Sequence, residues 1–206
     1  MSRQTSNARD RILTAANKMF YAEGIRAVSL DNIAEKAGIT KKTVYYHFKS
    51  KDDLVEAYLA SRDQPNLALY RKWFDEADGG LPDKVAAIFR QIATSARHPK
   101  WKGCGFLRTA AELANMPGHP AMKVGAAHKK KFELWLAQEF ETQGLVGGAA
   151  LSRQVVLLLD GAFSTILVHR DADYAEAAGE AARALVEREV RNSTQRGSGQ
   201  MESAST

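Results

Sequence analysis

Two short helical segments separated by a glycine are the feature that most constrains how this chain folds. Leu30–Ala37 and Lys41–Phe48 both have helix-favouring compositions, and Gly38 lies between them. Ser29 and Thr40 directly precede the two segments, and hydroxyl side chains are preferred at the N-cap of a helix. Two helices joined by a glycine-containing turn form a helix-turn-helix, so the sequence predicts one here.

Helical periodicity continues on both sides of this unit. Upstream, apolar residues recur at three- and four-residue spacing over Ala8–Glu23, which gives that segment one apolar face. Downstream, Ser50 is placed to cap a helix over Lys51–Gln64, and Asp53 lies at the third position, close to a capping box. Pro65 is expected to kink or end this helix.

The rest of the chain is also predicted to be helical. No segment alternates polar and apolar residues as a half-buried strand does. Further helices are predicted at Asn66–Ala77, Pro82–Arg97, Phe106–Asn115, Ala121–Gln143, Leu151–His169 and Tyr174–Val190. The expected fold class is therefore all-α, with about nine helices: an N-terminal three-helix domain that contains the helix-turn-helix, and a larger helical domain after it.

Composition suggests where these domains begin and end. Residues 1–8 are expected to be a flexible arm, residues 9–64 the helix-turn-helix domain with its linking helix, and residues 65–191 the larger helical domain. Residues 192–206 are rich in Ser, Thr, Gly and Gln. A segment with almost no apolar residues has little to bury, so this tail is expected to be disordered.

Several classes of protein are disfavoured by the sequence. A single cysteine, Cys104, makes no intrachain disulfide or cysteine-rich zinc site. The longest apolar run, Val155–Leu159, is cut by Asp160 and falls well short of the ~20 residues that cross a bilayer. No signal peptide, phosphate loop or hydrolase motif is found. We therefore expect a cytoplasmic protein that is not an enzyme and has no cofactor, metal or membrane partner.

The second helix of the helix-turn-helix has two contrasting faces. At ~100° per residue, Val44 and Phe48 point to the same side, and the other side carries polar groups. That outer face holds Lys42, Tyr46 and Lys49, with Thr43 beside them and Tyr45 and His47 at its edges. Lysine, threonine and tyrosine are suited to base edges and phosphates in a major groove. The net charge of +5 is compatible with such a partner.

The stretch Ser29–Leu54 resembles the TetR/AcrR family of bacterial regulators. The matching elements are Ile33-Ala34, Ala37-Gly38-Ile39, Thr40, Val44-Tyr45, His47-Phe48, Lys51 and Leu54. The preceding helix fits as well, through Ile12, Ala15-Ala16, Phe20 and Gly24. Lys42 departs from the family, which often has glycine there. The base preference of relatives therefore does not transfer to this chain.

The resemblance implies a role for each matching residue in binding a palindromic double-stranded DNA operator. Phosphates would be held from helix N-termini by Ser29 and Thr40, and along the backbone by Tyr45, His47 and Lys51. Bases would face Lys42, Thr43 and Tyr46, and the other lysines of the site are Lys41 and Lys49. Arg3 and Arg9 are placed to add contacts ahead of the first helix.

The resemblance also implies that the second half forms a ligand cavity and a homodimer interface. The interface is expected at Leu151–His169 and Tyr174–Val190, where ordinary intrachain core is the alternative. The candidate ligand-binding residues are Phe89, Trp101, Phe106, Glu112, His128, Trp135 and Phe163. Each of them alone is more commonly part of a core. A metal site among Glu112, His128, Asp160 and His169 is not favoured, because no closely spaced histidine pair is present.

Together these features predict a sequence-specific transcriptional regulator. The expected mechanism is repression that is released when a small apolar effector binds the second half. The alternative is a DNA-binding protein of the same fold whose second half recruits a protein partner and senses no small molecule.

Overall fold

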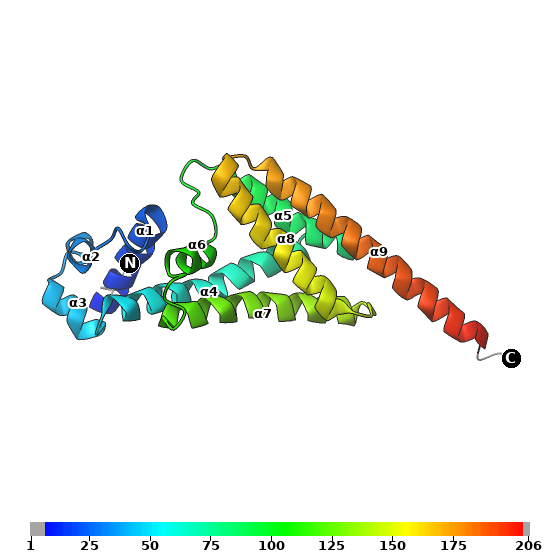
Figure 1. The fold of residues 1–206 in the computed structure, drawn as a ribbon, viewed down its shortest axis with the longest axis horizontal. Helices are drawn as coiled ribbons and strands as arrows, with labels where there is room; N and C mark the ends of the chain where they lie inside the picture. Colours follow the sequence, from blue (N-terminus) through cyan, green and yellow to red (C-terminus); the bar gives the residue numbers. More distant parts are fainter. Residues whose placement is uncertain (1–6, 204–206) are drawn as a thin grey trace, which may run out of the picture. The chain divides into compact units, whose positions relative to one another are not determined.

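The computed structural model describes the backbone of residues 7–203 and the side chains of residues 7–196. Within this part of the chain every regular element is a helix (Figure 1). The helices are α1 (Ala8–Glu23), α2 (Leu30–Ala37), α3 (Lys41–His47), α4 (Lys51–Asp75), α5 (Leu81–Ala96), α6 (Gly105–Glu112), α7 (Pro120–Thr142), α8 (Gly148–His169) and α9 (Asp173–Ser203). The predicted all-α class is confirmed, and most helix ends lie within three residues of their expected positions.

The helix-turn-helix forms where the local sequence predicts it. The Ser29 Oγ accepts a hydrogen bond from the Asn32 N–H at 3.1 Å, and the Thr40 Oγ1 accepts one from the Thr43 N–H at 3.2 Å. Gly38 ends α2 with φ +63°, a conformation that a residue without Cβ adopts at little cost. The first two helices have the predicted bounds, while α3 ends at His47 and Phe48 is its C-cap.

Pro65 does not end the helix, and the separate helix predicted over Asn66–Ala77 does not form. The chain forms a single 25-residue helix, α4, with Pro65 in its interior. An internal proline removes one helical hydrogen bond and costs about 3 kcal/mol. Buried residues lie on both sides of it, Tyr58 and Leu59 before and Tyr70 and Phe74 after. Their packing offsets the cost, because most helix stability in a protein comes from a buried face.

The C-terminal helix is also longer than predicted. The sequence suggests disorder from residue 192, whereas α9 continues to Ser203; residues 204–206 lie outside the described part. Once a helix is nucleated, each added residue gains a backbone hydrogen bond, so a polar stretch can extend a packed helix. The Ser193 hydroxyl also accepts a hydrogen bond from the Val146 N–H at 3.4 Å.

The helices form two compact units, which differ from the two domains expected from composition. One unit contains residues 1–66 and 104–128, and the other contains 67–103 and 129–206. The first boundary lies close to the predicted one at residue 65. Residues 104–128, which hold α6 and the start of α7, belong to the unit of the helix-turn-helix and not to the second unit. Residues 1–6 of the expected N-terminal arm lie outside the described residues.

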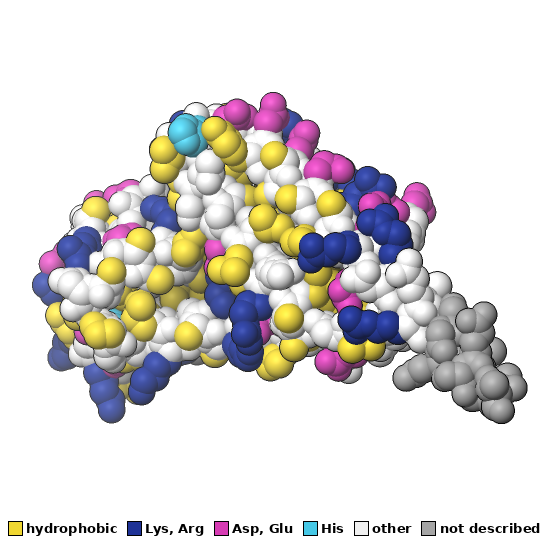
Figure 2. Space-filling model, turned by 45° about the vertical axis from the view of Figure 1, so that its right-hand side comes forward, with side chains coloured by type: hydrophobic (Ala, Val, Ile, Leu, Met, Phe, Trp, Pro, Cys, Tyr) yellow, Lys and Arg dark blue, Asp and Glu magenta, His cyan; other side chains and the backbone are white. Residues whose placement is uncertain are grey.

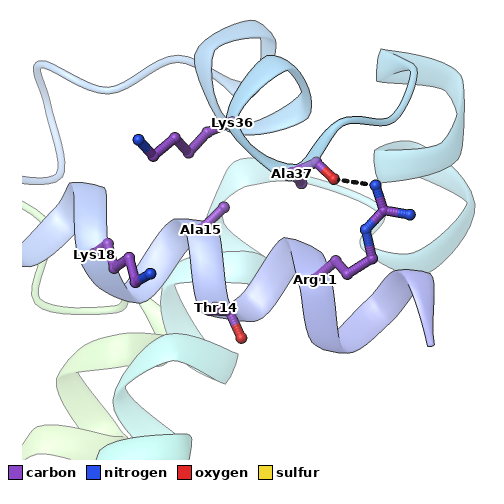
Figure 3. Close-up of a pocket in the computed structure, with 6 residues that line it drawn as sticks. All are labelled: Arg11, Thr14, Ala15, Lys18, Lys36 and Ala37. Atoms are coloured by element: carbon purple, nitrogen blue, oxygen red, sulfur yellow. Dashed lines mark hydrogen bonds between the residues drawn. The ribbon is translucent and has the colours of Figure 1, made fainter. Parts of the chain in front are cut away.

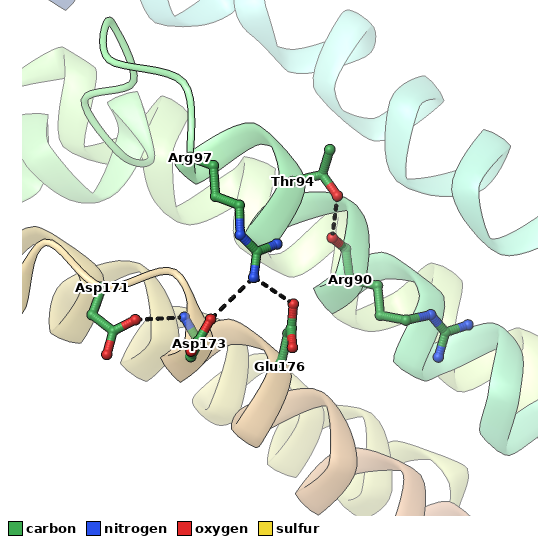
Figure 4. Close-up of polar contacts among 6 residues, drawn as sticks. All are labelled: Arg90, Thr94, Arg97, Asp171, Asp173 and Glu176. Atoms are coloured by element: carbon green, nitrogen blue, oxygen red, sulfur yellow. Dashed lines mark hydrogen bonds and ion pairs between the residues drawn. The ribbon is translucent and has the colours of Figure 1, made fainter.

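The second unit is built on α9, which packs against both α5 and α8. Phe89 of α5 is fully buried, and Gly179 of α9 allows the close approach: a Cβ there would lie 2.8 Å from the Phe89 Cβ. At the end of α5, Arg97 Nη2 bonds Asp173 Oδ1 at 3.0 Å and Glu176 Oε1 at 2.7 Å (Figure 4). These exposed ion pairs join the two helices at one end of an apolar contact.

Helix α8 is more apolar as a whole than its longest apolar run suggests. It has 22 residues and a mean hydropathy of 1.5 over its best window, which is long and apolar enough to cross a membrane by length and composition alone. A core helix of a soluble protein passes the same test, so this is weak evidence for a membrane. In this chain Val155, Leu159, Phe163 and Ile166 of α8 are buried.

Candidate nucleic-acid interface

The recognition helix α3 is held by a small apolar core. Val44 is fully buried and Phe48 is 4% exposed, so one side of α3 packs inward. This core also contains Ile12, Phe20 and Ile33 from α1 and α2. Arg9, expected to add a contact ahead of the first helix, lies in the first turn of α1, and its guanidinium is 5.2 Å from the centre of the Phe48 ring. Arg3 lies outside the described residues.

The outer face of α3 carries most of the side chains that the sequence places there. Tyr46 is 84% exposed and Lys42 is exposed on the same helix, whereas Lys49 is exposed but lies beyond the end of α3 at His47. Tyr45 is also exposed, at 48%, whereas Thr43 and His47 are half-buried. One ammonium group and a phenol therefore project from an anchored helix, and a second ammonium group follows its C-cap. This is the arrangement that reading base edges in a groove requires.

The hydroxyl groups at the helix N-termini already have partners within the chain. The Ser29 hydroxyl donates to Asn32 Oδ1 at 2.6 Å, and the Ser29 backbone N–H donates to the same oxygen at 3.1 Å, which completes a capping box. The Thr40 and Thr43 hydroxyl oxygens lie 2.9 Å apart and share one hydrogen bond. A phosphate contact from the Ser29 hydroxyl, as the resemblance implies, would require its hydrogen to leave Asn32.

Lys41 differs from its neighbour Lys42 because it is ion-paired. Its Nζ lies 2.8 Å from Asp31 Oδ2, and the hydrogen bond and charge of this carboxylate raise the pKa of Lys41. An approaching phosphate would compete with Asp31 for this ammonium group. Lys42 lies next to it on the exposed face of α3.

A groove of about 380 Å³ runs between the start of α2, α3 and the start of α4. Its lining includes four of the predicted DNA-binding residues: Ser29, Lys41, Tyr45 and Lys51. Partial burial lowers the pKa of Lys51, against the opposing effects of Glu112 and Asp52. The lining also includes Arg26, which was not predicted from the sequence. The sequence feature that could have identified Arg26 is its position, as a basic residue three positions before the N-cap Ser29.

The turn between α2 and α3 is fixed by a side chain from α1. Arg11 Nη2 donates to the carbonyl oxygen of Ala37 at 2.5 Å (Figure 3). It also donates to the carbonyl oxygen of Gly38 at 2.9 Å. These carbonyls lie at the C-terminus of α2, where a cation is favourable. Arg11 therefore couples the orientation of the recognition helix to α1. A surface pocket of about 230 Å³ beside it is lined by Thr14, Lys18 and Lys36 as well.

The structure does not bring the predicted ligand-binding residues together in one unit. In the second unit, Phe89, Trp135 and Phe163 are buried, and Trp101 stacks on Phe163 with ring centres 6.2 Å apart. Trp135 also contacts the ring of Phe74 edge-on at 5.4 Å. The other three candidates, Phe106, Glu112 and His128, belong to the first unit.

The polar candidates have protein partners. His128 is buried, lies 2.9 Å from Asp63 Oδ1 and stacks on Phe106 at 3.7 Å. Glu112 accepts a hydrogen bond from the backbone of the α1–α2 loop. Asp160 pairs with Lys129, and His169 stacks on Tyr174. Among the described residues, no three His, Cys, Asp or Glu side chains gather as a metal site would require.

Comparisons with known proteins agree with this geometry. The family model "Bacterial regulatory proteins, tetR family" matches residues 12–58. SrpR, an HTH-type transcriptional regulator of Pseudomonas putida, is 39% identical over 84 residues. That match covers 35% of this chain and only 39% of SrpR. The HTH-type transcriptional repressor KstR2 of Mycolicibacterium smegmatis is 26% identical over 141 residues, 68% of each chain.

Solved structures extend the likeness to almost the whole chain. The crystal structure of SCO4454, a TetR-family transcriptional regulator from Streptomyces coelicolor, matches with a TM-score of 0.72 and 32% identity. The match covers 90% of this chain and 95% of SCO4454. E. coli NemR in its reduced form shares the fold, with a TM-score of 0.75 at 16% identity. The chain therefore belongs to the TetR family of transcriptional regulators, and residues 12–58 are its helix-turn-helix region.

Proposed function

We propose that this protein is a homodimeric repressor that binds a palindromic operator and is released by a small, largely apolar effector. The observation that carries the DNA-binding part is the exposed face of α3, where Lys42 and Tyr46 project from a helix anchored by Val44 and Phe48, with the exposed Lys49 directly after the C-cap. A repressor role is supported by the likeness to KstR2, an HTH-type transcriptional repressor.

A dimer is supported by two exposed stripes on adjoining helices. On α8, Leu157, Gly161, Ser164 and Val168 recur at helical spacing and are exposed, Leu157 by 67% and Val168 by 75%. On α9 the exposed stripe is Tyr174, Ala177, Ala181 and Ala184. Hydrophobic side chains are exposed on the face drawn in Figure 2. Two copies of this helix pair would bury the stripes in a four-helix bundle, where small residues allow close packing.

Effector release requires a connection between the sensing and reading parts of the chain. Helix α4 contributes its residues up to 66 to one unit and the remainder to the other, and α7 divides in the same way after residue 128. A ligand that tilts these helices changes the distance between the two α3 helices of a dimer. That distance must match about one turn of DNA, ~34 Å, for both helices to enter successive major grooves. Two aromatic pairs of the second unit, Trp101 with Phe163 and Trp135 with Phe74, support an apolar ligand.

The DNA-binding proposal predicts different effects for two lysines. Sites are first selected from a random duplex library, and affinity is then measured by fluorescence anisotropy from 50 to 200 mM salt. Lys51→Ala should weaken binding to all duplexes alike and reduce the salt slope by about 0.9 for each phosphate that is no longer neutralised. Lys42→Ala should relax the preference at one base pair per half-site, a discrimination of about 1–3 kcal/mol.

The matched control is Lys100→Ala, which removes an exposed lysine of the second unit and should change neither property. If the wild type and Lys42→Ala selected the same DNA motif, the assignment of base contacts to the exposed face of α3 would be wrong. If the wild type bound no duplex at low salt, the proposed function itself would fail.

The release mechanism predicts that DNA and effector weaken each other's binding by the same factor, because linkage is reciprocal. Effectors are sought by thermal shift against a panel of small apolar molecules, and a hit is titrated calorimetrically with and without operator. Equal affinity in both titrations would exclude release, and tighter binding with operator would indicate a co-repressor. If no molecule in a broad panel binds while a protein partner is captured by the second unit, the partner-recruiting alternative is favoured.

A further inference from the structure

Two hydrogen bonds join the loop between α1 and α2 to the last residue of α6 and to the turn that follows it. The Arg26 backbone N–H donates to Glu112 Oε2 at 3.0 Å. The Arg26 Nη2 donates to Asn115 Oδ1 at 2.9 Å. All three residues belong to the first unit, although 86 positions of sequence separate Arg26 from Glu112. This pair of hydrogen bonds, the Arg26 latch, therefore fixes both the backbone and the side chain of Arg26.

The approach of Glu112 depends on a glycine in the same loop. Gly24 has φ +92°, and a Cβ there would lie 3.0 Å from Glu112 Oε1. Any side chain at this position would be strained and would crowd the carboxylate. The loop therefore has the backbone conformation and the free space that let the Glu112 carboxylate reach the Arg26 N–H.

Arg26 lines the groove of about 380 Å³ between the start of α2, α3 and the start of α4. Arg26 shares this groove with Lys41, Tyr45 and Lys51, three residues that the resemblance assigns to DNA. Arginine presents five N–H donors in a planar fork suited to phosphate oxygens. The hydrogen bond to Asn115 engages one terminal nitrogen of this fork.

We propose that Arg26 is an additional phosphate-binding residue and that Glu112 is the positioning residue that holds it at the groove. This inference rests on the proposed DNA-binding function and adds two residues to that site. Glu112 acts through the backbone of the loop and does not touch DNA, since a carboxylate beside a phosphate would be repelled. Its essential property is a side-chain oxygen acceptor of the right length.

The test compares four proteins on one selected operator by fluorescence anisotropy at salt concentrations from 50 to 200 mM. Arg26→Ala should weaken binding several-fold and reduce the salt slope by about 0.9 for each phosphate that it no longer neutralises. Glu112→Ala should produce the same two changes, because Arg26 is no longer held. Glu112→Gln keeps the acceptor oxygen and should restore the slope and affinity to within about twofold of the wild type.

Two further variants separate positioning from general damage to the fold. The double variant Arg26→Ala/Glu112→Ala should bind no more weakly than Arg26→Ala alone, because both changes act on one coupled interaction. Glu141→Ala, which removes an exposed acid from the second unit, should leave binding unchanged. Circular dichroism and thermal melting monitor folding. If Glu112→Ala melts at a lower temperature than the wild type, the positioning role of Glu112 is judged from Arg26→Ala and Glu112→Gln instead.

The outcomes distinguish this inference from the function on which it rests. A wild type that binds no duplex would remove the proposed function. A wild type that binds with a steep salt slope, with Arg26→Ala giving the same slope, would overturn the inference alone. Tighter binding by Glu112→Ala would also overturn it, because Glu112 would then be an electrostatic competitor of DNA. Failure of Glu112→Gln to restore binding would exclude the acceptor role.

Discussion

Replacing Ala181 with glutamate should convert the dimer into monomers and weaken binding to a two-half-site operator by about 100-fold or more, since linked sites gain that much from bivalency. Ala181 is exposed in the single chain and lies in the small-residue stripe of α9. In a four-helix bundle this position would be covered by the partner. A carboxylate there would lose its water without gaining a compensating charge, which is costly.

Analytical ultracentrifugation at micromolar concentration measures the first effect, and anisotropy with the selected operator measures the second. The matched control is Ala68→Glu, the same substitution at an exposed alanine of α4, which should remain dimeric. Circular dichroism checks that both variants are helical. A wild type that sediments as a monomer, or an Ala181→Glu variant that remains dimeric, would contradict the proposed interface.

Phe89→Ala should reduce the free energy of unfolding by about 3–5 kcal/mol, the cost of removing a fully buried aromatic ring. Phe89 of α5 is 0% exposed and contacts α9 where Gly179 leaves room for it. The cavity left behind cannot close easily, because the neighbouring helices are held by their own packing. A loss of this size is a large fraction of the stability of a typical domain.

Chemical denaturation followed by circular dichroism measures this loss, at one fixed protein concentration because dimerisation contributes to stability. Leu134→Ala is the control: Leu134 of α7 is 56% exposed, so its truncation should cost less than about 1 kcal/mol. If the two variants were equally stable, the α5–α9 contact would not be the core of the second unit. The measurement also shows whether Phe89, a candidate pocket residue, acts through stability.

The helix-turn-helix could be predicted because the residues that specify it act locally. Ser29, Gly38 and Thr40 specify where the two helices begin and end, through caps and turn conformation that act within a few residues. The helical repeat then determines that Val44 lies opposite Tyr46. Most of the predicted DNA-binding residues are exposed as expected, and their contact with DNA stays a prediction.

The Arg26 latch could not be predicted in this way. Glu112 was a candidate ligand-binding residue because it lies beside apolar positions in the second half of the sequence. The fold instead joins its carboxylate to the backbone of the loop ahead of α2. Nothing in a sequence gives the partner of a side chain that is 86 residues away. The only nearby signals were Gly24 and a basic residue before the N-cap.

The sequence by itself therefore determined the all-α class, the helix-turn-helix and the polar face of α3, because capping, periodicity and turn chemistry operate over short distances. The tertiary structure alone decided that α4 continues through Pro65 and that residues 104–128 belong to the same compact unit as the helix-turn-helix. Burial on both sides of a proline can outweigh its local cost. Whether it does so depends on which distant residues are brought into contact, and only the folded chain provides them.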